Sequence, residues 1–436
     1  MAPWKLVALG VVTELLYLGL YVPTSASGGV VFFIAVNALA FLPFGIVVRH
    51  TLSARGETVP NKTTLWLIVV FGLLFRLTLV PLTPVASDDM YRYVWDGKVA
   101  LSGTNPFAFA PDDPQLSSLH SEDLPSKINF PLMRTIYPPL AQAFFTFSNA
   151  LFGDSISSMK LLLTLCELCT LIVLLLLLKH LAINPAMVVL YAWSPLPIMY
   201  FGLDGHIDAL GIPFMLLSIY LIMKNRTVSG AFALGFAGLA KLYPLFIVPL
   251  LLNAKKSLKA NSVSLLPLII FGAGCLVYFE PTGGLVESFI VYNSQFEFNG
   301  SVFSLVNFIL NENTTAHLVC GLLFIAWILG VAFLNRSLIE KTFLAFLGFI
   351  VCSPVVHPWY LSWLAALIVI RWSPAAFSLL LLSNLSNVVV YQYKVSGKWL
   401  DSPLLMFLEY LPFFALLTWE FLRDRFPSGS ARSQGA

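Results

Sequence analysis

The chain has 436 residues, of which 58% are hydrophobic and only 11% are charged, and its net charge at pH 7 is +3. This composition excludes an ordinary water-soluble fold, in which about 25% of residues are charged. The small net charge comes without a block rich in Lys and Arg, so no nucleic-acid partner is expected. Long apolar runs separated by polar loops indicate an all-α, polytopic membrane protein.

Three apolar runs open the chain, near residues 4–24, 28–48 and 63–83. Each has about the 20 residues that a helix needs to span the hydrocarbon core of a bilayer. Arg49 and Lys62 lie between the second and third runs, and such basic loops stay on the cytoplasmic side. The N-terminus is therefore expected in the cytoplasm, and the third run is expected to end on the outer side.

The longest polar stretch follows at residues 84–157 and is predicted to be an external loop. Its acidic residues Asp88, Asp89, Asp96, Asp112, Asp113, Glu122 and Asp123 are only partly offset by Arg92, Lys98, Lys127 and Arg134. A helix is predicted from Asp88 to Ser102, because Gly103 follows as a typical helix end. The segment Pro138–Phe152 is predicted to be an interfacial helix, since a full crossing would reverse the charge pattern of every later loop.

A second external loop is predicted at residues 281–315, which carry Glu287, Glu297 and Glu312 but no Lys or Arg. The basic residues of the other late loops then all lie on the cytoplasmic side, as the charge rule for membrane proteins requires. Both termini are expected on that side.

The chain is therefore predicted to be one integral membrane domain over residues 1–436, with about 12 to 14 transmembrane helices. Residues 1–55 supply two extra spans before the helix that leads into the first external loop. Residues 424–436 are predicted to form a polar tail.

Two regions are too short for two full crossings, residues 228–252 and residues 341–371. Lys241 lies at the turn of the first and His357 at the turn of the second. Each leg has about 13 to 16 residues, or roughly 20 to 24 Å of helix, which is less than the 30 Å core. Such broken legs are tolerated where the backbone is buried in protein or lines a wet cavity. Both turns therefore predict an indentation that opens to the outside.

Four groups of ionisable residues are predicted to meet at this outer face: Asp88 with Asp89, the segment Asp204–Asp208, Lys241, and His357. Ionisable groups at the membrane edge are costly unless they face protein or water, so they are candidates for a functional site. A structural alternative stays open for each group. The aspartates can simply begin a helix, and His206 and Asp208 can be boundary residues at the entry to the next apolar run. Lys241 can extend to the surface, and His357 can belong to an interfacial aromatic belt.

Five motifs of the chain, spread over about residues 63–372, resemble those of GT-C superfamily glycosyltransferases. The resemblance is particularly to bacterial polyprenyl-phosphate-mannose-dependent mannosyltransferases. The motifs are Ser87-Asp88-Asp89-Met90-Tyr91-Arg92-Tyr93-Val94-Trp95-Asp96-Gly97 with Gly103-Thr104-Asn105-Pro106-Phe107, then Tyr137-Pro138-Pro139-Leu140, Gly205-His206-Ile207-Asp208-Ala209, Gly238-Leu239-Ala240-Lys241-Leu242-Tyr243-Pro244, and Pro354-Val355-Val356-His357-Pro358-Trp359-Tyr360. Their order and their common face make the resemblance specific.

The resemblance implies an inverting transfer of a sugar, most simply mannose, from a polyprenyl-phosphate carrier to an acceptor hydroxyl outside the cytoplasm. Asp88 or Asp89 would be the general base, and the motif aligns on either. Lys241 and His357 would bind the phosphate of the donor, supported by Arg76 or Arg92.

Four further residues are expected to contact substrate hydroxyls: His206, Asp208, Asp96 and Tyr243. A divalent metal between the first aspartates and Asp208 would need a dedicated ligand spacing, and the sequence has none. No metal or other cofactor is therefore expected.

The expected partners are a polyprenyl-phosphate sugar, a glycan or glycolipid acceptor and membrane lipids. The expected location is the cytoplasmic (inner) membrane of a bacterium, with the active site facing outward. A transporter or flippase for lipid-linked substrates is the alternative, since broken helices occur in those proteins too. Against it, the sequence has no two matching halves, and its ionisable residues gather at one face. A non-catalytic membrane protein of related descent is a third possibility.

Overall fold

The computed structural model describes residues 1–22, 25–54, 61–122, 124–252, 257–280 and 284–425. Within these ranges the chain is helical, and β pairing is limited to an isolated bridge of Phe298 and Asn299 with Val355. The predicted all-α membrane fold is confirmed. Asp123 and residues 426–436 of the predicted polar tail lie outside the described residues.

The first half of the chain forms long helices around one interrupted segment. Its helices are α1 (Pro3–Leu18), α2 (Ala26–Ser53), α3 (Lys62–Leu79), α4 (Asp89–Leu101), α5 (Pro139–Phe152), α6 (Ile156–His180), α7 (Val189–Ala192), α8 (Pro195–Pro197), α9 (Asp208–Met223) and α10 (Thr227–Ala240). A π-helical segment, Ile198–Leu203, joins α8 to the loop before α9.

The second half contains more short helices. They are α11 (Val248–Leu251), α12 (Leu258–Val277), α13 (Gly284–Gln295), α14 (Ser301–Leu310), α15 (Asn313–Phe333), α16 (Leu338–Cys352), α17 (Ser362–Ile368), α18 (Pro374–Leu382), α19 (Asn387–Ser396) and α20 (Pro403–Arg425).

Seven helical stretches of the described residues are long and apolar enough to cross a membrane, or up to eight if one bent pair counts as a single span. The 12 to 14 crossings expected from sequence included shorter segments. Apolar helices of that kind are present, α9 and α10 among them. The protein is a multi-pass membrane protein.

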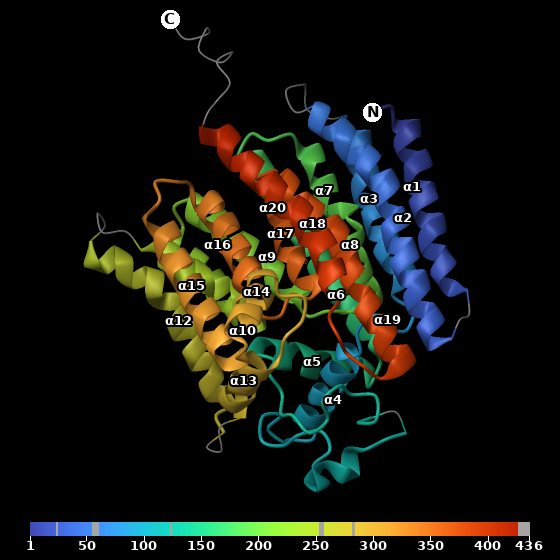
Figure 1. Cartoon of the computed structure of the whole chain (residues 1–436), viewed down its shortest axis with the longest axis vertical. Helices are drawn as coiled ribbons and strands as arrows, with labels where there is room; N and C mark the ends of the chain where they lie inside the picture. The colour runs from blue at the N-terminus through green and yellow to red at the C-terminus, as the bar shows by residue number, and fades with distance from the viewer. Residues whose placement is uncertain (23–24, 55–60, 123, 253–256, 281–283, 426–436) are drawn as a thin grey trace, which may run out of the picture.

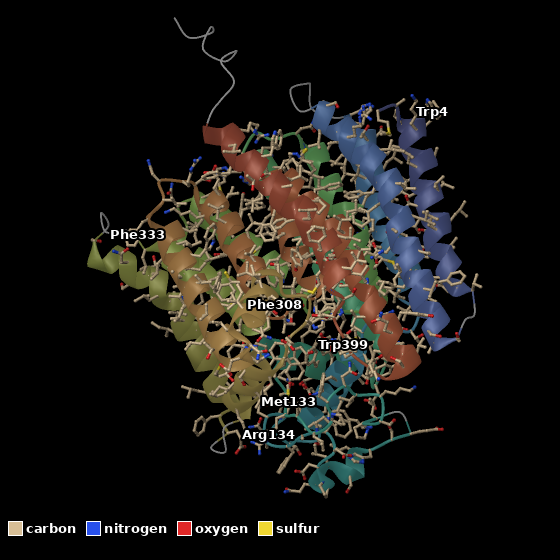
Figure 2. The ribbon with its side chains drawn as sticks, viewed as in Figure 1. Trp4, Met133, Arg134, Phe308, Phe333 and Trp399 are labelled. Carbon is tan, nitrogen blue, oxygen red and sulfur yellow. The ribbon has the colours of Figure 1, made fainter. Side chains whose placement is uncertain are left out.

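Apolar side chains cover much of the outer surface of the bundle, which is consistent with a lipid environment. Trp4, Phe308 and Phe333, labelled in Figure 2, are 67%, 85% and 86% exposed. Many leucine, valine and isoleucine side chains of α1, α2 and α15 are exposed as well. Soluble monomers rarely expose continuous apolar surfaces of this extent.

The two ends of the bundle are different. Figure 1 places the start of α1 and the end of α20 at one end, and α4 and α5 at the other. Helices α4 and α5 pack against each other, and both belong to the predicted first external loop. That loop therefore lies opposite to the N-terminus, as the charge pattern predicted.

Helix α4 begins and ends close to the predicted positions, at Asp89 and Leu101. Gly103 follows with φ +85°, a backbone conformation that favours glycine. Helix α5 covers Pro139–Phe152 and has only 14 residues, which agrees with a helix that does not cross the bilayer.

Both predicted hairpins are broken helices. Helix α10 ends at Ala240, Lys241 is extended, and a 3₁₀ turn at Tyr243–Ile247 begins the return. Helix α16 ends at Cys352, and a 3₁₀ turn at Pro358–Leu361 leads into α17. The two breaks place Lys241 and His357 at the ends of short helices, where their side chains can reach a common site.

Candidate active site

The loop Asp204–Asp208, between the π-helical segment and α9, holds three separate parts of the candidate site. Asp204 is buried, and its Oδ1 accepts hydrogen bonds from the backbone N–H groups of Val85 at 2.7 Å and Ala86 at 3.2 Å. It therefore fixes the segment that leads into α4. The other two parts are Asp89, which His206 of the same loop contacts, and Lys241, which pairs with Asp208.

Gly205 lets this loop turn sharply in a crowded place. Its φ is +77°, and a Cβ there would lie 2.0 Å from Cε of Met90 and 3.0 Å from Cγ of Lys160. Lys160 itself is buried and donates to the carbonyls of Leu79, Leu82 and Leu203. The ends of α3 and of the π-helical segment are thus tied to α6 beside the loop.

Asp89, the first residue of α4, faces this loop. Its Oδ2 lies 3.6 Å from Nδ1 of His206, and its side chain is 28% exposed. Burial raises the pKa of Asp89, but the contact with His206 and the charge of Lys241 outweigh burial and leave that pKa below its usual value. Asp89 is therefore a carboxylate at neutral pH.

The neighbouring Asp88 has different surroundings. It is the N-cap residue of α4, yet its side chain makes no capping hydrogen bond. Burial raises its pKa, the charge of Lys394 lowers it, and the charge of Asp89 raises it, so that the pKa lies above the usual value. The structure thus distinguishes two aspartates between which the sequence could not choose.

His206 lies in the loop Asp204–Asp208, and His357 lies directly before the 3₁₀ turn that leads into α17. Both imidazole rings stack on the indole ring of Trp359. The ring centroids of His206 and Trp359 are 3.8 Å apart, and those of His357 and Trp359 are 4.1 Å apart, with nearly parallel planes in both pairs. The bridge of Phe298 with Val355 holds this turn from the side of the second external loop. The stack fixes both imidazoles near Asp89.

Lys241 is held by the last residue of the loop. Its Nζ donates to Oδ2 of Asp208 at 3.3 Å, while Nε1 of Trp363 donates to Oδ1 of Asp208 at 2.8 Å. The ammonium also lies 5.4 to 5.9 Å from the ring centroids of Tyr137, Tyr243 and Tyr360. Its side chain is 14% exposed, so it is accessible although it is paired.

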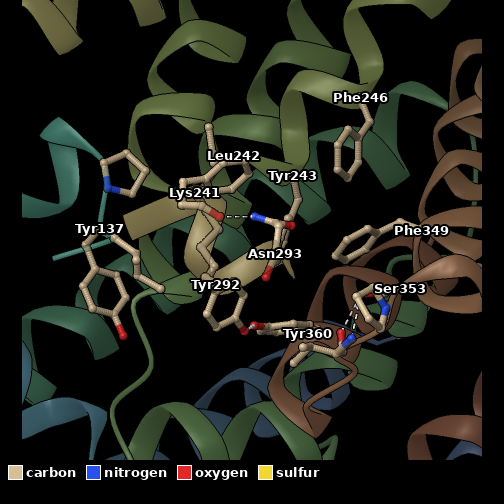
Figure 3. A pocket seen from close by; sticks show the side chains of 15 residues that line it. Tyr137, Lys241, Leu242, Tyr243, Phe246, Tyr292, Asn293, Phe349, Ser353 and Tyr360 are labelled. Carbon is tan, nitrogen blue, oxygen red and sulfur yellow. Dashed lines mark hydrogen bonds between the residues drawn. The ribbon is translucent and has the colours of Figure 1, made fainter. Parts of the chain in front are cut away.

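An open pocket with about 790 Å³ of empty space extends from Lys241. Aromatic rings dominate its lining, as Figure 3 shows for the residues around Lys241. The lining includes Tyr137, Tyr243, Phe246, Phe289, Tyr292, Phe349 and Tyr360.

Three of the residues expected at the site are bound elsewhere. Arg76 is 1% exposed and forms an ion pair with Glu167 at 2.8 Å, and its remaining N–H groups face backbone carbonyls of α3 and α7. Arg92 donates to Asp96 at 2.7 Å and to the carbonyl of Met133 at 2.9 Å. The structure therefore does not bring Arg76, Arg92 or Asp96 to the group around Lys241.

No group of three or more His, Cys, Asp or Glu side chains has a metal-binding arrangement in the part of the chain that the structure describes.

A family model described as alpha-(1→6)-mannopyranosyltransferase, N-terminal domain, matches residues 11–255, more than half of the chain. The chain belongs to this family. It is thus a member of a GT-C-type mannosyltransferase family, and the resemblance seen in the motifs is confirmed. No curated protein matches the chain.

The matched segment of this membrane mannosyltransferase contains Asp89, His206, Asp208 and Lys241. His357 lies beyond it, as do Trp359 and Tyr360. The second half of the chain nevertheless contributes one wall of the site, because Tyr360 lines the pocket and Trp359 stacks on His206.

Some residues of the site carried no signal in the sequence. Asp204 was named only as part of an ionisable segment, and its bond to the backbone before α4 could not be foreseen. Tyr292 comes from the second external loop, and its hydroxyl lies 2.7 Å from that of Tyr360. Lys394 acts on Asp88 from α19. A tyrosine or lysine near a membrane surface is too common for either to be selected without a structure.

Proposed function

We propose that this mannosyltransferase takes mannose from a polyprenyl-phosphate carrier and transfers it to an acceptor hydroxyl with inversion, and that Asp89 is the general base. One observation carries the proposal. The carboxylate of Asp89 and the ammonium of Lys241 are held by His206 and Asp208, two residues of one loop, beside an aromatic pocket.

The pocket favours a donor that has both a phosphate and an apolar chain. Its aromatic walls suit isoprenoid carbons, and Lys241 supplies a positive charge at one side. An ammonium has three N–H donors, of which Asp208 takes one. The remaining donors are available to phosphate oxygens. A water-soluble nucleotide sugar would gain little from such walls.

At the anomeric carbon the reaction forms one bond and breaks one. The acceptor oxygen bonds to the anomeric carbon, and the bond from that carbon to the phosphate oxygen breaks with its electron pair. The proton of the acceptor hydroxyl passes to Asp89, and the charge that develops on the leaving phosphate is met by Lys241. Attack from the side opposite to the phosphate inverts the configuration.

The site residues take different roles in this proposal. His206 holds Asp89 as a carboxylate, and Asp208 positions Lys241. His357 supports the donor phosphate from the next turn, and Tyr243 contacts the donor in the pocket. Arg76, Arg92 and Asp96 contact no substrate, because their polar groups are occupied by other parts of the protein.

We further propose that the site faces away from the cytoplasm of a bacterium, in its inner membrane. Among the basic residues, Lys179 lies in the last turn of α6, which follows α5, and Lys224 and Arg371 come after the ends of α9 and α17. Such residues stay on the cytoplasmic side. The acceptor is then a glycan or glycolipid outside the cytoplasm, and the reaction needs no metal. The family match favours this enzyme over the alternative of a transporter or flippase.

The proposal is tested with the purified full-length chain in detergent or reconstituted membranes. Radiolabelled mannose is offered as polyprenyl-phosphate mannose or as GDP-mannose, with EDTA present, and an alpha-(1→6)-linked mannotetraose serves as acceptor. Polyprenyl-phosphate glucose is the matched control for the sugar. We expect only polyprenyl-phosphate mannose to be consumed and the tetraose to be extended. Consumption of GDP-mannose instead would contradict the proposed donor.

A further inference from the structure

A second open pocket lies on the neighbouring face of α13, and nothing above assigns it a role. Its empty space is about 1270 Å³. Ser288, Val291 and Gln295 of α13 line it, whereas Phe289, Tyr292 and Asn293 of the same helix line the first pocket. Helix α13 is therefore the wall between the two pockets.

The chemistry of the second pocket is different from that of the first. Its charged side chains, Arg134 and Glu287, lie 3.4 Å apart and offset each other. Its aromatic rings are accessible, because Phe130 is 59% and Tyr393 46% exposed. Figure 2 shows Arg134 and Met133 at the end of the bundle that carries α4. A polar surface without net charge and with exposed aromatic faces suits pyranose rings, which have both apolar faces and hydroxyl groups.

The other two walls of this pocket are the loop at residues 129–134 and the part of α19 around Tyr393. Hydrogen bonds connect the first to α4 and the second to the segment before α4. The loop that contains Met133 is held by Arg92 of α4, and Arg92 is held in turn by Asp96. On the other side, Lys394 follows Tyr393 and donates to the carbonyl of Val85 at 3.0 Å. The pocket is therefore built around the same short stretch that positions Asp89.

Aromatic rings connect the two pockets. Phe130 contacts Phe296 with ring centroids 4.8 Å apart, Phe296 stacks on Tyr292 at 5.0 Å, and the Tyr292 hydroxyl reaches Tyr360. Phe130 and Phe296 line the second pocket, and Tyr292 and Tyr360 line the first. The two linings therefore meet at Phe296, directly after the end of α13.

We propose that the second pocket binds the acceptor, a neutral oligosaccharide whose terminal sugar presents its hydroxyl to Asp89 while the donor occupies the first pocket. This inference rests on the proposed function. It assigns donor and acceptor to opposite sides of one helix, so that each substrate has its own set of contacts. Phe130 and Tyr393 are the residues that the pyranose rings contact.

The test compares Phe130→Ala and Tyr393→Ala with Phe308→Ala, an equally drastic change at an exposed phenylalanine outside both pockets. Steady-state kinetics are measured with polyprenyl-phosphate mannose and the alpha-(1→6)-linked mannotetraose. Binding of the tetraose to the donor-free protein is measured by calorimetry, and its octyl glycoside is titrated in parallel to separate a free glycan from a glycolipid.

For Phe130→Ala and Tyr393→Ala we expect the KM for the tetraose and its calorimetric Kd to rise about tenfold each, as for removal of an aromatic anchor. The KM for the donor stays unchanged, and Phe308→Ala matches the parent protein. Unchanged acceptor KM and Kd in both pocket variants, with transfer intact, would overturn this inference and leave the proposed function standing. Absence of any transfer from polyprenyl-phosphate mannose by the parent protein would overturn both.

Discussion

Adjacent aspartates have opposite surroundings at the start of α4. His206 and Lys241 lower the pKa of Asp89, while burial raises that of Asp88. A residue pair that looks redundant in the sequence thus contains one carboxylate beside His206 and one on which the charge of Lys394 acts. The roles of the two residues follow from what each side chain faces, and not from the residue type.

The pH dependence of transfer should reveal the contact of His206 with Asp89. A general base acts as the carboxylate, so activity is lost as the pH falls through its pKa. His206→Phe keeps a ring to stack on Trp359 but removes the contact that lowers the pKa of Asp89. We expect the acid limb of kcat/KM against pH to move to higher pH. His120→Phe, the same change elsewhere in the external loop, should leave the limb in place, and an unmoved limb in His206→Phe would contradict the assignment.

Lys241→Gln should weaken binding of the sugar donor, although the glutamine amide can still donate a hydrogen bond to Asp208. Loss of a charged hydrogen bond to phosphate predicts a rise in donor KM of roughly 10- to 100-fold. Lys98→Gln is the matched control, because Lys98 pairs with Asp154 on the protein surface, where ion pairs contribute little. A donor KM that is equal in the two variants would exclude Lys241 from phosphate binding.

The loop Asp204–Asp208 is the element on which the site depends. Its residues fix the chain before α4, contact Asp89 and bind Lys241. It makes these contacts because Gly205 turns the backbone between Met90 and Lys160. A small shift of this loop therefore moves base and cation relative to each other, which matters when reacting atoms must be held within a fraction of an ångström.

A comparison of Gly205→Ala with Gly103→Ala separates the cost of backbone strain from the cost of steric overlap. Both glycines have positive φ, and each alanine should lose about 1 to 2 kcal/mol of stability from backbone strain. Only at Gly205 would the added Cβ overlap a neighbour, Cε of Met90. We expect Gly205→Ala to lower both the thermal midpoint and kcat more than Gly103→Ala does. Met90→Ala in the Gly205→Ala background should restore part of the difference. Equal losses for the two glycines would contradict this account.

At the scale of the whole molecule, buried ionisable groups divide into those of the site and those that join helices. The ion pair of Arg76 with Glu167 connects α3 to α6 deep in the bundle. Removing one partner should cost about 3 to 5 kcal/mol, because the other charge stays buried without compensation. The double variant Arg76→Met with Glu167→Met should recover most of that stability in thermal unfolding and leave the donor KM unchanged. A large rise in donor KM in a stable double variant would indicate that Arg76 does contribute to donor binding.

Much of the architecture could be predicted from local sequence. Gly103 marked the end of α4, and the lengths of the two hairpins predicted breaks at Lys241 and His357, because helix ends and span lengths depend on nearby residues. The bonding partners of buried polar side chains could not be predicted in the same way. The bonds of Arg76 to Glu167 and of Asp204 to Val85 join residues far apart in the chain, and only packing decides them. For the same reason Arg76 looked like a site residue.

We propose that distant parts of the chain meet so that Asp89, and not Asp88, takes the proton of the acceptor. The most direct measurement compares Asp89→Asn with Asp88→Asn in single-turnover transfer from polyprenyl-phosphate mannose, with equal amounts of folded protein. Asn preserves the size of Asp but cannot take up the proton. We predict that Asp89→Asn lowers the rate by about 10²- to 10⁴-fold, as expected for loss of a general base, while Asp88→Asn retains most of it. A larger loss in Asp88→Asn, or near-normal transfer by Asp89→Asn, would contradict the account.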